Sequence, residues 1–263
     1  MKEVFAVAES AWGMEEPASF VGDLLNAVRY HGGLVLGAYD GTELVGFLFG
    51  IIGRAGDMYY VYSHMTGVTE QKKYSGIGRR LKLRQREWAR EHGYELVAWT
   101  FDPLMSLNGN FNIRKLGAIS RTYLVNFYGT MTDRLNAGIE TDRLIAEWWT
   151  GEERESETFR PEDYETLTET RIGRSGMREI ASVHEPAGDR VTVEIPYDFV
   201  RLKQEKMDAA IRWRMETRKL FRELFSSGYV VTSFVSEGGR SYYLLDRKYP
   251  MPPAWKDRVF KQE

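Results

Sequence analysis

The stretch VTEQKKYSGIGRRLKL, residues 68–83, decides the fold of this sequence. It follows Met58–Val68, a run rich in aromatic and β-branched residues that predicts a strand, and Gly76 and Gly78 open a helix predicted to end near His92. The first four amides of a helix lack partners inside the helix, and the helix dipole makes that end partly positive. Because glycines let an anion approach the backbone, this turn predicts a binding site for a phosphate group.

Two familiar phosphate-binding loops do not fit this turn. A Walker loop requires a Gly-Lys pair, which the sequence lacks, and a dinucleotide fingerprint requires a third glycine where Leu81 stands. Lys72, Lys73, Arg79 and Arg80 add positive charge around the glycines. From the glycines alone, a plain turn between strand and helix is an equal alternative.

Outward from this turn the sequence predicts alternating helices and strands, and therefore an α/β fold. Asp40-Gly41 predicts a hairpin in which both turn residues adopt positive φ. The remaining predicted elements are helices 1–12, 17–31, 108–116, 141–149 and 198–227, and strands 34–39, 43–52, 95–101, 120–128, 190–195, 229–235 and 241–245. The acidic segment 151–170 is predicted to be a linker or long surface loop. His92-Gly93-Tyr94 and Ser227-Gly228-Tyr229 each join a helix to a strand, so the C-terminal half is either a degenerate repeat or a chance likeness.

Composition bounds the function. The chain has 263 residues, 43% of them hydrophobic, with a formal charge of −2, which argues against a general nucleic-acid binder. The absence of cysteine excludes thiolate metal sites and disulfides, and the four histidines show no metal-binding spacing. The longest apolar stretch, 44–53, is too short to span a membrane, and no secretory signal is visible. We therefore expect a soluble, cytoplasmic protein without a metal.

The glycine turn resembles a known family signature. Val68, Lys73, Gly76 and Gly78, in this spacing after a strand and at the start of a helix, resemble the acyl-CoA motif of the GNAT N-acyltransferases. Lys73 stands where the family has Gln or Arg, and the order of predicted elements over residues 1–130 is similar, apart from a missing first strand.

A narrower resemblance covers most of the chain. It is to a subgroup of predicted GNAT proteins of this length, some of which are associated with N-acylamino-acid metabolism, where succinyl-CoA is a candidate donor. The runs that carry it are 101–104, 108–117, 128–129, 141–144, 194–196, 213–214 and 228–229.

The resemblance implies the architecture. It implies a GNAT-type mixed sheet in which the parallel strands 58–68 and 95–101 splay apart, flanked by helices, with a C-terminal α/β half. We expect 1–130 to be the acyl-CoA-binding half. The half 131–263 forms the acceptor site, packs as a pseudo-repeat or builds a dimer contact.

The resemblance also implies where acyl-CoA, acetyl-CoA most simply, is held. The pantetheine arm is expected to pair with the backbone of Thr66, Gly67 and Val68, whose amide stabilises the oxyanion. The pyrophosphate is expected on the loop and helix start. Those residues are Lys73, Tyr74, Ser75, Gly76, Ile77, Gly78 and Arg79. Asn108 and Asn112 are expected to hold the pantetheine amides, or else serve as cap and turn residues.

Direct attack by an amine on the thioester requires a base and an acid. His64, on the strand before Val68, is the candidate base, because some GNAT enzymes place a His or Glu there; packing against Tyr60 and Tyr62 is the alternative. The tyrosine acid of many members corresponds to Ile113, which has no proton to donate, so Tyr128 is the candidate acid, with Tyr123 as another option.

These inferences predict an N-acyltransferase that moves an acetyl, or else a succinyl, group from coenzyme A to a small-molecule amine or amino acid. Neither nucleic acid nor a membrane is an expected partner, and a homodimer is left open. A non-catalytic acyl-CoA-binding or sensing module is the first alternative, and a structural protein in which the loop is only a turn is the second.

Overall fold

The chain has a mixed α/β fold, as expected. The computed structural model describes residues 17–72, 75–129, 138–151, 153–154, 157–173, 176–252, 255 and 260, with side chains from residue 21 onward, so the expected helix 1–12 lies outside the described residues. Two compact units are present. One comprises Met1–Arg54 and Tyr59–Val97, and the other comprises Ala55–Met58 and Ala98–Glu263.

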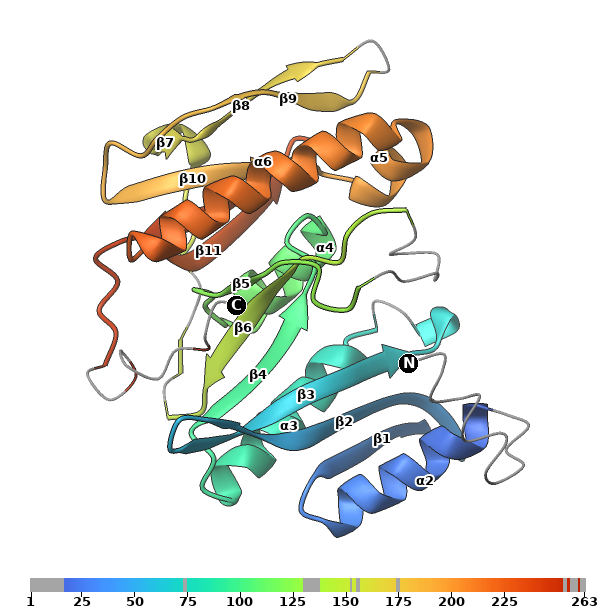
Figure 1. The fold of residues 1–263 in the computed structure, drawn as a ribbon. Helices are drawn as coiled ribbons and strands as arrows, with labels where there is room; N and C mark the ends of the chain where they lie inside the picture. The colour runs from blue at the N-terminus through green and yellow to red at the C-terminus, as the bar shows by residue number, and fades with distance from the viewer. Residues whose placement is uncertain are drawn as a thin grey trace. The chain divides into compact units, whose positions relative to one another are not determined.

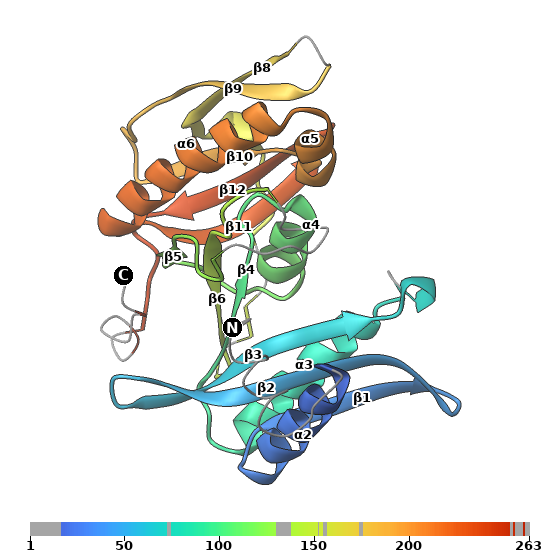
Figure 2. The same ribbon diagram turned by 45° about the vertical axis from the view of Figure 1, so that its right-hand side comes forward.

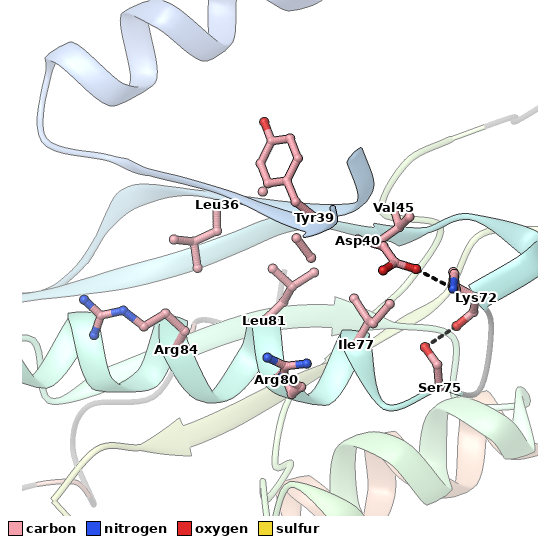
Figure 3. A pocket seen from close by; sticks show the side chains of 12 residues that line it. Leu36, Tyr39, Asp40, Val45, Lys72, Ser75, Ile77, Arg80, Leu81 and Arg84 are labelled. Carbon is pink, nitrogen blue, oxygen red and sulfur yellow. Dashed lines mark hydrogen bonds and ion pairs between the residues drawn. The ribbon is translucent and has the colours of Figure 1, made fainter. Parts of the chain in front are cut away.

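The first unit contains the glycine turn. Its elements are α2 (Pro17–Tyr30), β1 (Leu34–Asp40), β2 (Glu43–Ala55), β3 (Met58–Val68), a 3₁₀ turn (Glu70–Lys72), α3 (Ile77–Glu91) and the start of β4 (Leu96–Phe101). Helices α2 and α3 lie on opposite sides of β1 and β2 (Figures 1 and 3). On the α3 side, Leu34, Leu48 and Leu81 form a buried cluster, so the apolar stripe of α3 fixes the helix against the sheet.

The β1–β2 hairpin differs in its turn from the prediction. Asp40 pairs with Glu43 as the last position of β1, and only Gly41 adopts a positive φ, of 59°. Asp40 instead forms an ion pair with Lys72, in which Oδ2 and Nζ are 2.6 Å apart. The position of the hairpin was predicted correctly. The side chain of Asp40, however, binds Lys72 in the loop before α3, and Asp40 is not a turn residue.

The second unit contains a four-stranded sheet in addition to the strands β5 and β6. Its elements are the end of β4, α4 (Ser106–Gly109), a π-helical turn (Asn110–Lys115), β5 (Tyr123–Leu124), β6 (Arg143–Trp149), β7 (Glu165–Thr166), β8 (Thr168–Ile172), β9 (Arg178–Val183), β10 (Arg190–Ile195), α5 (Phe199–Glu205), α6 (Met207–Ser226), β11 (Val230–Glu237) and β12 (Arg240–Asp246). The strand order in that sheet is β11-β12-β10-β7, and β8 pairs with β9. Helix α6 runs along the sheet (Figure 2).

Strand β12 lies between β10 and β11. It is antiparallel to both, so β10 and β11 run parallel to each other on either side of it. The chain passes from β10 through α5 and α6 to β11 and then returns as β12.

Residues 143–149 form a strand, although a helix was predicted there. All seven residues of β6 are buried. An amphipathic helix would bury one stripe only, whereas a strand covered on both faces buries every residue. The two charged residues of β6, Arg143 and Glu147, have carboxylate and guanidinium partners respectively. Thr141, the predicted N-cap, instead accepts a hydrogen bond from the Tyr128 amide at 3.0 Å and donates one to the Gly129 carbonyl.

The acidic segment is part of the second unit, not a linker. Phe159 is 6% exposed and packs with Val235, Tyr242 and Leu244, and Tyr164 lies against this cluster. One face of β11 and β12 is therefore covered by the described part of segment 151–170. The charged residues concealed this because the buried apolar side chains of the segment, Phe159 and Leu167, lie eight positions apart and form no periodic pattern.

Two further predictions need correction. The predicted strand 120–128 is reduced to Tyr123–Leu124 with bridges at Ile119 and Ser120, because Asn126 adopts φ 45° and turns the chain. The long helix 198–227 is interrupted at Lys206, whose φ of −149° is not helical.

The two helix-to-strand joins share one geometry. The backbone amide of Tyr94 donates a hydrogen bond to the Ala89 carbonyl, and that of Tyr229 donates one to the Leu224 carbonyl. Gly93 and Gly228 adopt positive φ. Both are Schellman caps, a common helix ending. The chain passes from the first unit to the second between Val97 and Ala98. The assignment of roles to residues 1–130 and 131–263 stays a prediction, as does the splay of the two parallel strands.

Candidate functional site

The start of α3 has no cap of its own within the described chain. Gly76 is the N-cap residue in a left-handed conformation, with φ 83° and no side-chain hydrogen bond to the helix, and the first turn contains no acidic residue. Arg79 and Arg80 occupy that turn instead. Because the helix dipole favours negative charge there, a helix that begins with two arginines and no cap is suited to an external anion.

The backbone amides at this end separate into two groups. Ser75 donates its amide to the Lys72 carbonyl at 3.1 Å, so this expected ligand residue uses its amide within the loop. Within the described chain, the helical hydrogen-bond pattern of α3 begins with the Arg80 amide, which donates to the Gly76 carbonyl at 3.0 Å. Within the described chain, the amides of Gly76, Ile77, Gly78 and Arg79 are thus left for a ligand. Lys73 and Tyr74 lie outside the described residues.

Gly78 has no internal reason to be glycine. Its φ is not positive, and an added Cβ would lie 3.9 Å from the nearest atom, Cγ2 of Val68, which is ordinary contact. A glycine in a helix costs about 1 kcal/mol relative to alanine. The space above its Cα is therefore consistent with the close approach of a ligand.

A cavity of about 620 Å³ adjoins the loop, between β1 and the first half of α3 (Figure 3). Its apolar part is formed by Leu36, Val45, Ile77 and Leu81, and its cationic part by Lys72, Arg80 and Arg84. Asp40, which also lines the cavity, is paired with Lys72, and Arg84 is paired with Glu87. The positive potential beside the amides therefore comes from the helix start and from Arg79 and Arg80 more than from Lys72 and Arg84.

Gly67, near the end of β3, is a glycine because of packing within the sheet. A Cβ on Gly67 would lie 2.9 Å from the ring of Phe47, so Gly67 is required by a neighbour within the sheet. Thr66 is exposed and Val68 is half-buried. Thr69 donates its amide to the Val45 carbonyl at 2.9 Å, which holds the loop onto β2.

His64 is exposed at its position on β3 and lies among aromatic rings. Its ring centroid is 5.2 Å from that of Phe49 and 5.9 Å from that of Tyr62. Partial burial lowers the pKa of His64, which keeps the imidazole neutral near pH 7. A neutral imidazole can accept a proton, and no hydrogen bond to its ring is found among the described residues.

Tyr128 lies in the second unit, after the turn at Asn126 and not on a strand. Its hydroxyl is 2.9 Å from Oγ1 of Thr100. The guanidinium of Arg143 lies 5.2 Å from its ring centroid, and 38% of the residue is exposed. The sequence gives no signal for Thr100 and Arg143 at this place, because the folding of β4 and β6 brings them to Tyr128.

The two asparagines differ in their surroundings. Asn112 is 5% exposed and accepts a hydrogen bond from Nε1 of Trp99 at 3.1 Å, so its side chain is turned into the protein. Asn108 is half-buried at the end of α4. Ile113, at the position of the family's tyrosine, is fully buried.

Comparison with known proteins gives structural likenesses only. No family model matches the sequence, and no curated protein matches it. Among solved structures, an acetyltransferase described as of the GNAT family from Desulfovibrio desulfuricans is 19% identical, with a TM-score of 0.41 over 54% of this chain and 87% of its own. A ribosomal-protein-alanine N-acetyltransferase from Brucella melitensis is 18% identical, with a TM-score of 0.41 over 49% and 76%. An aminoglycoside 6'-N-acetyltransferase complexed with coenzyme A is 16% identical, with a TM-score of 0.39 over 54% and 86%.

Proposed function

We propose that this chain is a GNAT-type N-acyltransferase that transfers an acyl group from coenzyme A to a primary amine of a small molecule. The observation that carries the proposal is the start of α3. Among the described residues, it combines an N-cap glycine, backbone amides without a protein acceptor, a second glycine with open space and two arginines in the first turn. A diphosphate satisfies all of these features together.

The proposed chemistry is direct acyl transfer. The amine nitrogen attacks the thioester carbon, a C–N bond forms and the C–S bond breaks, and no acyl-enzyme forms. His64 is proposed to remove the ammonium proton before attack, because burial keeps its ring neutral. The thiolate takes its proton from Tyr128 or from water. The amide of Val68 is proposed to stabilise the oxyanion.

Ligand binding is tested by thermal unfolding of the full chain with coenzyme A, acetyl-CoA or dephospho-CoA. At a concentration 100-fold above Kd, a ligand of the native state raises stability by about 2.7 kcal/mol, or about 5–10 °C for a chain of this size. Adenosine, which lacks the diphosphate, is the control. No shift with either thioester or thiol form would remove the proposal.

Turnover is tested by release of free thiol from acetyl-CoA with a panel of amines and amino acids. Release that depends on an amine supports the transferase. The alternative, a non-catalytic acyl-CoA-binding module, is favoured by the buried Ile113 in place of a tyrosine. It would give the thermal shift without any amine-dependent thiol.

A further inference from the structure

A cavity of about 280 Å³ in the second unit is lined by charges of both signs. It is bounded by the β8–β9 hairpin, by the segment that joins β10 to α5 and by the turn between β11 and β12. The charged side chains that line it are Arg178, Asp198, Arg201 and Arg240. No residue that is proposed to hold acyl-CoA lines this cavity, so the cavity needs an explanation of its own.

A buried carboxylate fixes two of these arginines. Glu194, on β10, is 1% exposed. Its Oε1 accepts hydrogen bonds from Nε of Arg178 and Nε of Arg240, both at 3.0 Å. Its Oε2 accepts one from Nη2 of Arg240 at 2.6 Å and one from Oγ1 of Thr170 at 2.8 Å. Because four hydrogen bonds saturate the carboxylate, both guanidinium groups are held in place, and they lose little freedom when a ligand binds.

The two fixed arginines keep unused donors. Nη1 and Nη2 of Arg178 and Nη1 of Arg240 have no hydrogen-bond partner among the described residues. The side chains are 28% and 40% exposed, and in the described chain Glu194 is the only carboxylate paired with either of them. Two guanidinium groups and one carboxylate carry a charge of +1. Guanidinium N–H groups bind a further carboxylate through both of its oxygens.

The negative charge in the cavity comes from Asp198. Its Oδ1 accepts a hydrogen bond from the Arg201 amide at 3.0 Å and caps α5, while Oδ2 has no hydrogen-bond or ion-pair partner among the described residues. The Arg201 side chain pairs with Glu205, with Nε and Oε1 2.6 Å apart. In the same part of the chain no ion pair joins Asp198 to Arg178 or Arg240. The cavity therefore has a positive and a negative side that do not neutralise each other directly.

Apolar side chains complete the wall. Ile172, Met177, Pro196 and Leu202 line the cavity beside the charges, and Leu202 is 2% exposed. The volume lies just below the range of about 300–1,000 Å³ that is usual for drug-sized ligands. A molecule that matches all of these features is small and carries a carboxylate, an ammonium group and a short apolar part.

We propose that this cavity binds a free α-amino acid with an apolar side chain. The carboxylate lies on Arg178 and Arg240, the ammonium group lies at Asp198, and the side chain packs against the apolar wall. The site is independent of the proposed function, because the residues that form it belong to the second unit and take no part in the proposed transfer.

The first experiment compares molecules that share one carbon skeleton. The full chain is heated, without coenzyme A and at constant ionic strength, in leucine, in 4-methylpentanoate, which lacks the ammonium group, or in 3-methylbutylamine, which lacks the carboxylate. Leucine is expected to raise Tm, because it binds the native state, and each partial molecule should bind at least about 10-fold more weakly. Valine and methionine extend the series. Equal shifts with leucine and a partial molecule, or no shift with any of the three amino acids, overturn the site.

Variants test the two charges separately. Asp198→Asn removes the negative charge and keeps the cap of α5, because asparagine and aspartate cap a helix equally well. Arg240→Gln removes one guanidinium group and leaves Arg178 and Thr170 on Glu194. Both variants are expected to bind leucine at least about 10-fold more weakly, whereas Arg222→Gln, a matched loss on the exposed face of α6, should bind it unchanged. Wild-type affinity in Asp198→Asn contradicts the proposal even if Arg240→Gln fails to fold.

The position of the ligand is read from backbone amide signals in NMR spectra. Leucine should shift the signals of residues 176–178, 197–202 and 238–240. This readout separates the cavity from an acceptor site beside His64, where an amino acid would bind under the proposed function. Shifts that leave these three ranges unmoved overturn the site and leave the proposed function intact. Failure of coenzyme A to bind removes the proposed function and leaves this site standing.

Discussion

Gly76 and Gly78 are glycines for different reasons. Gly76 adopts φ 83°, a conformation that other residues reach only with strain. Within the described chain, Gly78 has neither a positive φ nor a neighbour closer than 3.9 Å to an added Cβ, which is consistent with the close approach of a ligand. Gly76 is therefore required by the backbone conformation, and Gly78 is assigned to the proposed ligand site.

Gly78→Ala should stabilise the unliganded protein by about 0.5–1 kcal/mol, because alanine favours a helix, and should reduce the thermal shift produced by coenzyme A. The matched control is Gly22→Ala in α2, where an added Cβ also has no close neighbour. That variant should gain stability and keep the full shift. An undiminished shift in Gly78→Ala would show that no ligand approaches this residue.

His64 should titrate below its ordinary pKa of about 6.5, because partial burial disfavours the charged ring. A folded-state pKa below the unfolded one means that the contribution to stability is complete above about pH 6.5 and is lost as the pH falls through the folded value. NMR titration of the ring, assigned with His64→Gln, measures the midpoint. If His64 is the base, the acid limb of kcat/KM should follow that midpoint, and a midpoint above 6.5 would contradict the burial argument.

At the scale of elements, buried polar contacts join segments distant in sequence. Arg121 donates from Nε to Glu147 on β6 at 3.0 Å, with 9% and 0% of their side chains exposed, and from Nη2 to the Trp255 carbonyl at 2.8 Å. On α3, Nζ of the buried Lys82 donates to Oγ of Ser63 on β3 at 2.8 Å. Each contact fixes one element against another within a single unit.

Arg121→Met should destabilise the protein by about 3–5 kcal/mol, because it leaves Glu147 buried without its cation. The double variant Arg121→Met, Glu147→Met should recover most of the loss. Urea unfolding of the four proteins gives the coupling free energy. Additive losses would mean that the pair does not act as a unit.

Lys82→Met should stabilise the protein at neutral pH by about 1–3 kcal/mol, because burial holds the pKa of Lys82 well below its usual range. The unfolded chain keeps that proton up to about pH 10.4, so the advantage should shrink as the pH approaches this value. Lys219→Met, on the exposed part of α6, is the control and should show no such dependence. A gain that is constant with pH would refute the assignment of a displaced pKa.

At the scale of the whole molecule, ligand binding is expected to slow amide hydrogen exchange more in the first unit than in the second. Coenzyme A should slow amide hydrogen exchange most at residues 76–82, whose amides are proposed to hold the diphosphate, and much less in the sheet formed by β10, β11 and β12. Exchange measured by mass spectrometry with and without the ligand gives the pattern. Equal protection in both regions would disagree with a diphosphate site at the start of α3.

The sequence predicted well the elements whose signals are local. Residues 58–68 and the helix after Gly76 were predicted nearly to the residue, because a strand-forming run and a glycine pair mark their ends. Strand β6 was missed because its burial on both faces is a property of its neighbours. The role of Phe159 was missed because one anchor in a charged segment gives no periodicity.

The candidate site divides in the same way. The amides at the start of α3 follow from glycine and helix geometry alone, so the sequence indicated them. Arg143 and Arg214 are separated by 71 positions, and both lie against the carboxylate of Asp102. No helix in the described chain is long and apolar enough to cross a membrane.

The position of β12 has a consequence for recognition. A flexible ligand arm that docks as an extra strand needs a strand edge whose peptide groups are not already paired. Between β10 and β11 the facing edges are both paired with β12. A thioester arm therefore cannot pair as an extra strand between β10 and β11, whether or not the C-terminal half is a degenerate repeat of the N-terminal half.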